Sequence, residues 1–352
     1  MKLAAVDQLK ESQLSQTLFA IIIGSLGALV FTMLQLPAAA LSGPVLALAI
    51  AGAVKVPLAF PDRLRDICLF GIGIAMGQAV TPDTLDRIGS WPVTIGLIPI
   101  VVGVITLASF SFLFFVCRWA RDLSYFASIP GALGFVVAVA EERQANLAPI
   151  MTVQLLRLII LVLFVPSLLS SVQDISGHEV AIRELSTPFE LGIIATLCLL
   201  GANFAHKISL PAPLLTGAFF VSSILAGSGV VTVVLPQWLT LPFYVGLGTL
   251  VGTRFAGIPL GDLRRWSVVA LGSFLAGILA SSAIAFAVSQ ALEIPFGQLL
   301  LAYAPGGMEV MALMAFILDF DPAFVATHQL VRYMGMVVLL PFVTNFLLGK
   351  KT

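Results

Sequence analysis

Continuous apolar runs separated by short polar loops fill almost the whole chain. The runs do not alternate polar and apolar residues, so the pattern indicates membrane-crossing helices rather than the strands of a β-barrel. Each half of the chain holds six runs. In the first half they span 17–34, 44–60, 67–80, 91–116, 126–140 and 147–169. In the second half they span 189–205, 211–235, 241–255, 266–292, 296–318 and 322–348. The pattern predicts an all-α polytopic membrane protein.

The run lengths suggest that not every segment crosses the membrane. A spanning helix needs about 20 predominantly apolar residues. The third run of each half is short, and a Pro-Gly pair interrupts the fifth. The predicted organisation is a polar N-terminal segment (1–16), a first membrane repeat (17–169), a polar linker (170–188) and a second membrane repeat (189–349).

The two halves are an internal duplication. The stretch from Ala127 to Pro166 recurs from Ala302 to Pro341, displaced by 175 positions without a gap. The displaced positions share a Pro-Gly break and a Gln-x-x-Arg motif in the next run. Two further repeated features are a turn, Ser42-Gly43 and Thr216-Gly217, and a glycine set, Gly71, Gly73, Gly77 and Gly246, Gly248, Gly252. The Gly-x-x-x-Gly spacing in each glycine set predicts close helix packing.

The distribution of Lys and Arg favours inverted repeats. Cytoplasmic loops of membrane proteins are enriched in these residues. If the fifth run of each half re-enters and leaves on one side, each half crosses five times and the N-terminus is cytoplasmic. Only Arg87 and Arg183 then lie outside, with Arg157 and Arg332 inside the membrane. A fifth run that crosses fully while the third does not is the main rival arrangement.

The paired breaks are the predicted substrate-binding walls. Pro130 and Pro305 lack an amide donor and disfavour helix before them. Unwound backbone at membrane depth is tolerated only inside protein or beside a water-filled cavity, and paired broken helices point to a transporter's site. The predicted wall residues are Pro130, Gly131 and Gly134 in the first half, and Pro305, Gly306, Gly307 and Glu309 in the second.

Arg157 and Arg332 are the predicted charges of this site, and Gln154 and Gln329 lie three residues before them on the same helical face. An arginine at the bilayer centre costs at least ~2.5 kcal/mol, so it should face protein or water. Its planar fork suits a carboxylate or phosphate ligand. The alternative is a structural role, in which each arginine donates hydrogen bonds to bare carbonyls of a break.

Glu309 and His328 are the candidates for carrying a coupling proton. Glu309 is the one acid in a break and corresponds to Gly134, while His328 corresponds to Val153. A carboxyl group buried away from water holds its proton more tightly. A plainer alternative is that Glu309 pairs with one of the two arginines. Because Arg157 and Arg332 together carry more positive charge than Glu309 can neutralise, the site favours an anionic ligand.

Composition narrows the function classes. Of 352 residues, 59% are hydrophobic and only 10% are charged, whereas soluble domains carry about 25% charge. The net charge of zero gives no basic face for nucleic acid. His178, His206 and His328 are scattered, and the three cysteines form no Cys-x-x-Cys pair. No cofactor and no metal site are therefore expected; the expected partners are the lipid bilayer and a small solute, and homo-oligomerisation is left open.

At these motifs the chain resembles the AbrB membrane-protein family, whose halves are called AbrB duplication domains. The resemblance rests on the Ser42-Gly43 and Thr216-Gly217 turns, the Pro-Gly breaks and the Gln-x-x-Arg pairs. It implies an integral protein of the bacterial inner membrane. The family is labelled both as ammonia monooxygenases and as regulators of gene expression. Copper oxidation needs clustered imidazole ligands, so the residues do not support the oxygenase label.

Three functions are weighed on this basis. The first is a secondary transporter of a small, anionic organic solute. The second is a membrane sensor or regulator of gene expression, in which the same cavity binds a signal and a partner protein reads it. The third is a membrane enzyme, which the absence of a nucleophile-base or metal constellation disfavours.

Overall fold

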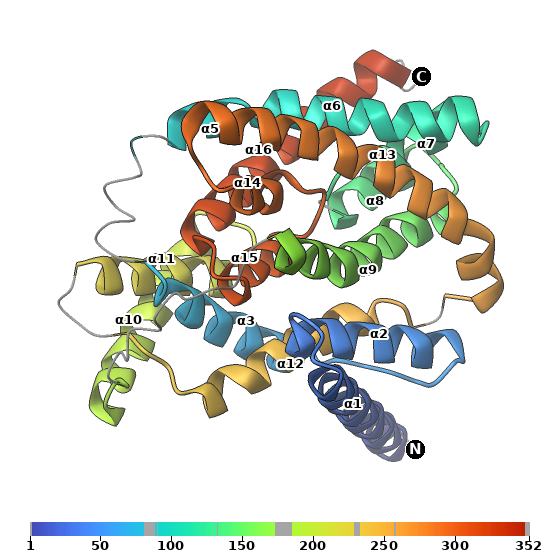
Figure 1. Ribbon diagram of the computed structural model, residues 1–352. Helices are drawn as coiled ribbons and strands as arrows, with labels where there is room; N and C mark the ends of the chain where they lie inside the picture. The colour runs from blue at the N-terminus through green and yellow to red at the C-terminus, as the bar shows by residue number, and fades with distance from the viewer. Residues whose placement is uncertain are drawn as a thin grey trace. The chain divides into compact units, whose positions relative to one another are not determined.

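A computed structural model describes residues 2–80, 89, 91–131, 133–172, 185–228, 233–256 and 258–348 (Figure 1). The regular secondary structure in these ranges is helical, with no strand. The helices of the first half are α1 (Lys2–Met33), α2 (Ala39–Ala53), α3 (Asp62–Gly77), α5 (Trp91–Gly96), α6 (Ile98–Ser111), a π-helical turn η2 (Phe112–Val116), α7 (Arg121–Ser128), α8 (Leu133–Glu142) and α9 (Leu147–Val172). Those of the second half are α10 (Pro188–Lys207), α11 (Pro213–Gly227), α12 (Gln237–Thr253), α13 (Leu260–Leu292), α14 (Phe296–Tyr303), α15 (Met308–Ile317) and α16 (Pro322–Leu348).

Six helical stretches in the described residues are long and apolar enough to cross a membrane. They are Gln13–Met33, Trp91–Val116, Leu147–Leu169, Pro188–Lys207, Leu260–Leu292 and Pro322–Leu340. These are the first, fourth and sixth runs of each half. Large apolar side chains on them face outward, such as Phe204 at 65% and Val268 at 75% exposure, as contact with lipid requires. The prediction of an all-helical fold with several helices suited to crossing a membrane is confirmed for the described residues.

Several element boundaries differ from the sequence expectation. The first helix begins at Lys2, so the expected polar segment 1–16 continues directly into the first run. The second run of each half gives a helix of only 15 residues, Ala39–Ala53 and Pro213–Gly227. In α2 the helix starts five residues before Pro44 and tolerates that proline inside it. Of the predicted linker 170–188, residues 173–184 lie outside the described part of the chain, as do Arg87 and Arg183.

The chain folds into two compact units, each built from both halves. The first unit comprises Met1–Thr81 and Val162–Leu260, and the second comprises Pro82–Leu161 and Gly261–Thr352. The first unit thus holds the first three runs of each half. The second holds most of the last three, including both Pro-Gly breaks. The repeat boundaries predicted from the sequence follow the duplication rather than these units and remain a prediction.

In the first unit, helices of one half pack against helices of the other half. A Cβ placed on Gly73 of α3 would lie 2.5 Å from the carbonyl oxygen of Leu215 in α11. The equivalent contact forms with the halves reversed. A Cβ on Gly248 of α12 would lie 2.6 Å from the carbonyl oxygen of Leu41 in α2. A contact repeated with its partners swapped is what a pseudo-twofold relation produces. The prediction that the glycine sets mediate close helix packing is confirmed.

Within each half, a second pair of glycines brings consecutive helices together. A Cβ on Gly43 of α2 would lie 2.3 Å from the carbonyl oxygen of Gly27 in α1. In the second half, a Cβ on Gly217 of α11 would lie 2.5 Å from the carbonyl oxygen of Gly201 in α10. Both contacts involve the repeated Ser-Gly and Thr-Gly motifs, so these motifs serve helix packing.

In the second unit, α6 and α13 run side by side (Figure 1). The Ser109 hydroxyl donates to the carbonyl oxygen of Ser273 at 3.1 Å, and Trp119 packs edge-on against Trp266. The buried core beside the first break contains Tyr125, Phe126, Ile129, Val136, Ala140, Ile150, Met336 and Leu340. Because Met336 and Leu340 come from α16, segments of both halves enclose this break.

Candidate functional site

Both predicted breaks are real interruptions of the helices. Helix α7 ends at Ser128 and α8 begins at Leu133, while α14 ends at Tyr303 and α15 begins at Met308. The residues before the prolines, Ile129 and Ala304, are extended, with ψ of 125° and 144°. A proline disfavours helix at the preceding residue and offers no amide donor, so both copies stop at the same place for the same reason.

Gln154 and Gln329 hold the ends of the helices before the breaks. The amide nitrogen Nε2 of Gln154 donates to the carbonyl oxygen of Phe126 at 2.9 Å. That of Gln329 donates to Leu301 at 2.8 Å and to Ala302 at 3.2 Å. Each glutamine thus reaches back 28 positions, and the two bonds are related by the repeat offset. They satisfy carbonyls that the interrupted helices leave without an internal partner.

Arg157 and Arg332 donate hydrogen bonds to the backbone of the breaks themselves. Nη2 of Arg157 donates to the carbonyl oxygen of Ile129 at 3.0 Å. Arg332 donates from Nη1 to Ala304 and from Nη2 to Gly306. The structural role weighed for the arginines is therefore present in both copies. Binding of a ligand by the same side chains remains a prediction.

The arginines retain free donors after these bonds. Each side chain is only 4% exposed. Nη1 of Arg157 and Nε of Arg332 are buried and have no hydrogen-bond partner among the described residues. The two guanidinium groups also repel one another. Two buried cations with unused N–H groups make an environment that favours an anion.

The two breaks meet at Gly131. A Cβ on this residue would lie 3.2 Å from Nη2 of Arg332 and 3.4 Å from the carbonyl oxygen of Gly306. Gly131 also has a φ of +86°, in the left-handed region that glycine occupies without a steric penalty. The first break therefore depends on a glycine both for its backbone conformation and for its approach to the second.

We expect Gly131→Ala to destabilise the protein by about 1–2 kcal/mol, the cost of left-handed backbone for an L-residue, and to displace Arg332. The matched variant is Gly306→Ala, whose Cβ would meet the flexible side chain of Met311 at 2.8 Å and whose φ is not positive. Its effect should be smaller. Apparent melting temperatures of the two variants in lipid nanodiscs would compare them; equal losses would contradict the role given to φ.

Glu309 does not pair with either arginine. No ion pair within 4.0 Å joins Glu309 to Arg157 or Arg332, all of which belong to the described part of the chain, so the plainer expectation for Glu309 is wrong. Glu309 is half-buried in the first turn of α15, where the helix dipole favours an anion. Its repeat partner Gly134 occupies the first turn of α8. Of the remaining wall residues, Pro130, Pro305 and Gly306 are buried and Gly307 is half-buried.

His328 is fully buried and engaged on both ring nitrogens. Nδ1 lies 2.7 Å from the carbonyl oxygen of Phe324, which can only accept, so Nδ1 carries a hydrogen. Nε2 lies 2.8 Å from the Thr94 hydroxyl, and the Tyr303 hydroxyl donates to the Thr94 carbonyl oxygen at 3.0 Å. This cluster ties α5 to α14 and α16. Thr94 and Tyr303 were not predicted from the sequence, because neither is matched by a polar residue with the same role in the other repeat.

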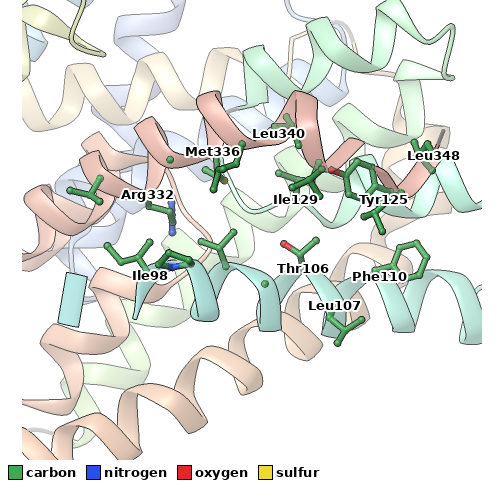
Figure 2. Close-up of a pocket in the computed structure, with 18 of the residues that line it drawn as sticks. Ile98, Thr106, Leu107, Phe110, Tyr125, Ile129, Arg332, Met336, Leu340 and Leu348 are labelled. Atoms are coloured by element: carbon green, nitrogen blue, oxygen red, sulfur yellow. The ribbon is translucent and has the colours of Figure 1, made fainter. Parts of the chain in front are cut away.

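A cavity of about 870 Å³ opens beside the first break, between α6, α7 and α16 (Figure 2). Arg332 and Ile129 contribute to its wall, so it is continuous with the site where the breaks meet. Its polar lining residues are Thr106, Arg121, Tyr125 and Arg332. Within the described residues no cluster of three or more His, Cys, Asp or Glu is placed to hold a metal ion.

Comparison with known proteins identifies a protein family and two relatives. A family model described as "Transition state regulatory protein AbrB" matches residues 41–348. The chain is 28% identical over 287 residues to "Uncharacterized protein YhjN" of Bacillus subtilis (strain 168), covering 77% of this chain and 75% of that protein. It is 23% identical over 328 residues to "Putative regulator AbrB" of Escherichia coli (strain K12), covering 90% and 92%. No solved structure matches significantly. Neither relative bears the name of an enzyme.

Proposed function

Because this chain belongs to the AbrB family and has helices suited to crossing a membrane, we propose that it is a secondary transporter of a small anionic organic solute. The solute binds where the two helix breaks meet. The observation that carries the proposal is the pair of buried guanidinium groups, which have unused N–H donors and no acidic partner within 4.0 Å in the part of the chain that the structure describes. An anion bound between them would offset the cost of burying both charges.

The duplicated breaks support the same site. Unwound backbone inside a membrane helix is tolerated where it lines a cavity, and discontinuous helices in both halves of a chain are typical of transporter binding sites. We propose that Pro130 to Gly134 and Pro305 to Glu309 form its walls. In that arrangement the fifth segments re-enter, the halves are inverted, and the N-terminus is on the cytoplasmic side of the bacterial inner membrane.

In this proposal the polar residues near the breaks have different roles. Gln154 and Gln329 hold the backbone of the breaks, and Arg157 and Arg332 bind both the breaks and the solute. Glu309 is the better candidate for a coupling proton, since it is half-buried and unpaired with either arginine. His328 is less well placed, because its ring nitrogens are already committed to Phe324 and Thr94.

The second candidate function is a membrane sensor that regulates gene expression through a partner protein. The name of the Escherichia coli relative favours it. The same site would then bind a signal molecule without moving it across the membrane. Uptake into proteoliposomes separates the two functions, because a sensor would bind the anion but not accumulate it.

The first test is thermal unfolding of the purified protein against a panel of small anions and matched neutral solutes. A ligand at 100 times its Kd should stabilise the fold by about 2.7 kcal/mol. The shift should disappear in Arg157→Gln and Arg332→Gln and persist in Arg264→Gln, which alters an exposed arginine of α13. A shift that survives both buried substitutions would move the site elsewhere, and no shift with any anion would argue against the proposal.

A further inference from the structure

The cavity beside Arg332 is a long, mostly apolar groove. The buried Arg332 lies at one end, and the exposed Arg121 is the other charged residue of its lining. Figure 2 shows Arg332 and Ile98 at one end and Tyr125, Phe110 and Leu348 at the other. Arg332 and Leu348 are 16 positions apart on α16, which corresponds to about 24 Å along the helix. A small compact solute would fill only the end of this space next to the break.

Glycines keep the groove open. Gly103 of α6 and Gly335 of α16 both line it, and a Cβ on either would meet no atom within 4 Å. Elsewhere in the molecule, glycines on facing helices bring backbones into contact, as Gly43 and Gly27 do. Here the helices stay apart and leave a space that no side chain of the described residues fills.

The groove opens toward the surroundings of the helices. Leu107 is 65% exposed and Leu339 52% exposed, and both line it. These apolar side chains lie on helices suited to crossing a membrane, so the open side faces a medium in which hydrocarbon chains are dissolved. A ligand with an apolar chain can reach Arg332 from this side.

The charged end accepts only a small headgroup. The two bonds to Ala304 and Gly306 occupy two of the five N–H groups of Arg332. Its Nε is unpartnered and enclosed by protein, and Gly131 and Gly306 bound the space next to the guanidinium group. A planar carboxylate matches this fork, whereas a bulky phospholipid headgroup does not fit beside an enclosed nitrogen. The volume of about 870 Å³ also falls within the range of single small-molecule pockets, about 300–1,000 Å³.

We infer that this groove binds a single-chain amphiphilic carboxylate, with the carboxylate at Arg332 and the hydrocarbon chain between α6 and α16. The inference rests on the proposed anion site and specifies the class of solute that the site takes. Chain length should therefore determine affinity as strongly as charge does.

The test measures binding of linear carboxylates from butanoate to hexadecanoate to the protein in zwitterionic nanodiscs, by displacement of a fluorescent long-chain carboxylate. Empty nanodiscs provide the correction for partitioning into lipid. Each buried methylene contributes about 0.8 kcal/mol, so affinity should rise about fourfold per carbon until the groove is full. Alcohols of equal length should bind at least tenfold more weakly, and Arg332→Gln should abolish that difference between carboxylates and alcohols.

Two substitutions test the position of the chain. Gly103→Leu and Gly335→Leu should weaken long carboxylates more than tenfold and leave short ones unchanged, because they fill the groove beyond the charge. Gly192→Leu in α10 is the matched control, since a Cβ on Gly192 would also meet no atom within 4 Å but this residue lies outside the groove. It should leave all affinities unchanged.

Each failure has a distinct meaning. Equal affinity of short and long carboxylates would overturn the groove inference while leaving the small-anion site intact. Equal binding of alcohols and carboxylates, insensitive to Arg332→Gln, would identify a lipid-chain pocket and also overturn it. Binding of alkylphosphocholines in preference to carboxylates would assign the groove to phospholipid. If no carboxylate of any length binds, the inference falls together with the anion site.

Discussion

Replacing Arg332 with glutamine should lower the free energy of unfolding by about 2–5 kcal/mol. The side chain donates to the carbonyl oxygens of Ala304 and Gly306, and a hydrogen bond from a charged donor contributes about 1.5–3 kcal/mol. Part of that loss is offset, because the substitution also removes the repulsion between Arg332 and Arg157. Denaturant or thermal unfolding in nanodiscs without added anion measures the effect.

The repeat supplies the matched control for this prediction. Arg157 makes one such bond, to Ile129, so Arg157→Gln should cost about 1–3 kcal/mol, less than Arg332→Gln. Arg332→Lys should be intermediate, because one ammonium group cannot reproduce the two-pronged contact of the guanidinium. A variant Arg332→Gln that is more stable than the parent protein would mean that the buried charge is a net burden and that its bonds to the break contribute little.

Replacing Gly43 with alanine should destabilise the first unit by about 3 kcal/mol. The new methyl group would lie 2.3 Å from the carbonyl oxygen of Gly27 and 2.8 Å from the amide nitrogen of Ala28. These are backbone atoms, so α1 and α2 must separate, and such overpacking typically costs about 1–3 kcal/mol or more. The repeat predicts a loss of similar size for Gly217→Ala, which meets the backbone of Gly201 and Ala202 at 2.5 Å.

Apparent melting temperatures of the two variants test this, with Gly103→Ala and Gly192→Ala as controls. Neither control Cβ has a neighbour within 4 Å, and alanine favours helix over glycine by about 1 kcal/mol. The controls should be unchanged or slightly stabilised. Two tolerated substitutions at Gly43 and Gly217 would show that the helices are not held at the observed distance.

The sequence predicted the elements that depend on local chemistry. Apolar runs located the helices, and Pro130 and Pro305 located both breaks to within a few residues. The Gln-x-x-Arg motif also indicated the side chains that satisfy the breaks, because a bare carbonyl in a membrane must find a donor. What made these features visible was duplication: a pair of polar residues displaced by 175 positions stands out from an apolar background.

Contacts between distant segments were not predictable in this way. Nothing near Thr94 indicates that its hydroxyl meets His328, 234 positions away. The apolar groove also has no sequence signature, since Gly103 and Gly335 resemble the glycines that pack helices tightly. The sequence left open whether Glu309 pairs with an arginine or carries a proton, because charge alone does not fix the distance between them. In the structure the dipole of α15 provides an alternative stabilisation for the carboxylate.

The packing of helices from one half against helices of the other half affects folding during synthesis. Helix α3 leaves the ribosome long before α11, the helix that Gly73 and Gly77 contact, and α2 is likewise made before its partner α12. During synthesis the faces of α3 and α2 that contact α11 and α12 therefore have no partner, and a nascent chain in this state is open to mispairing with other helices. The order of synthesis makes the second half the completing component of both compact units. Two separately expressed halves should consequently be degraded alone and recover together.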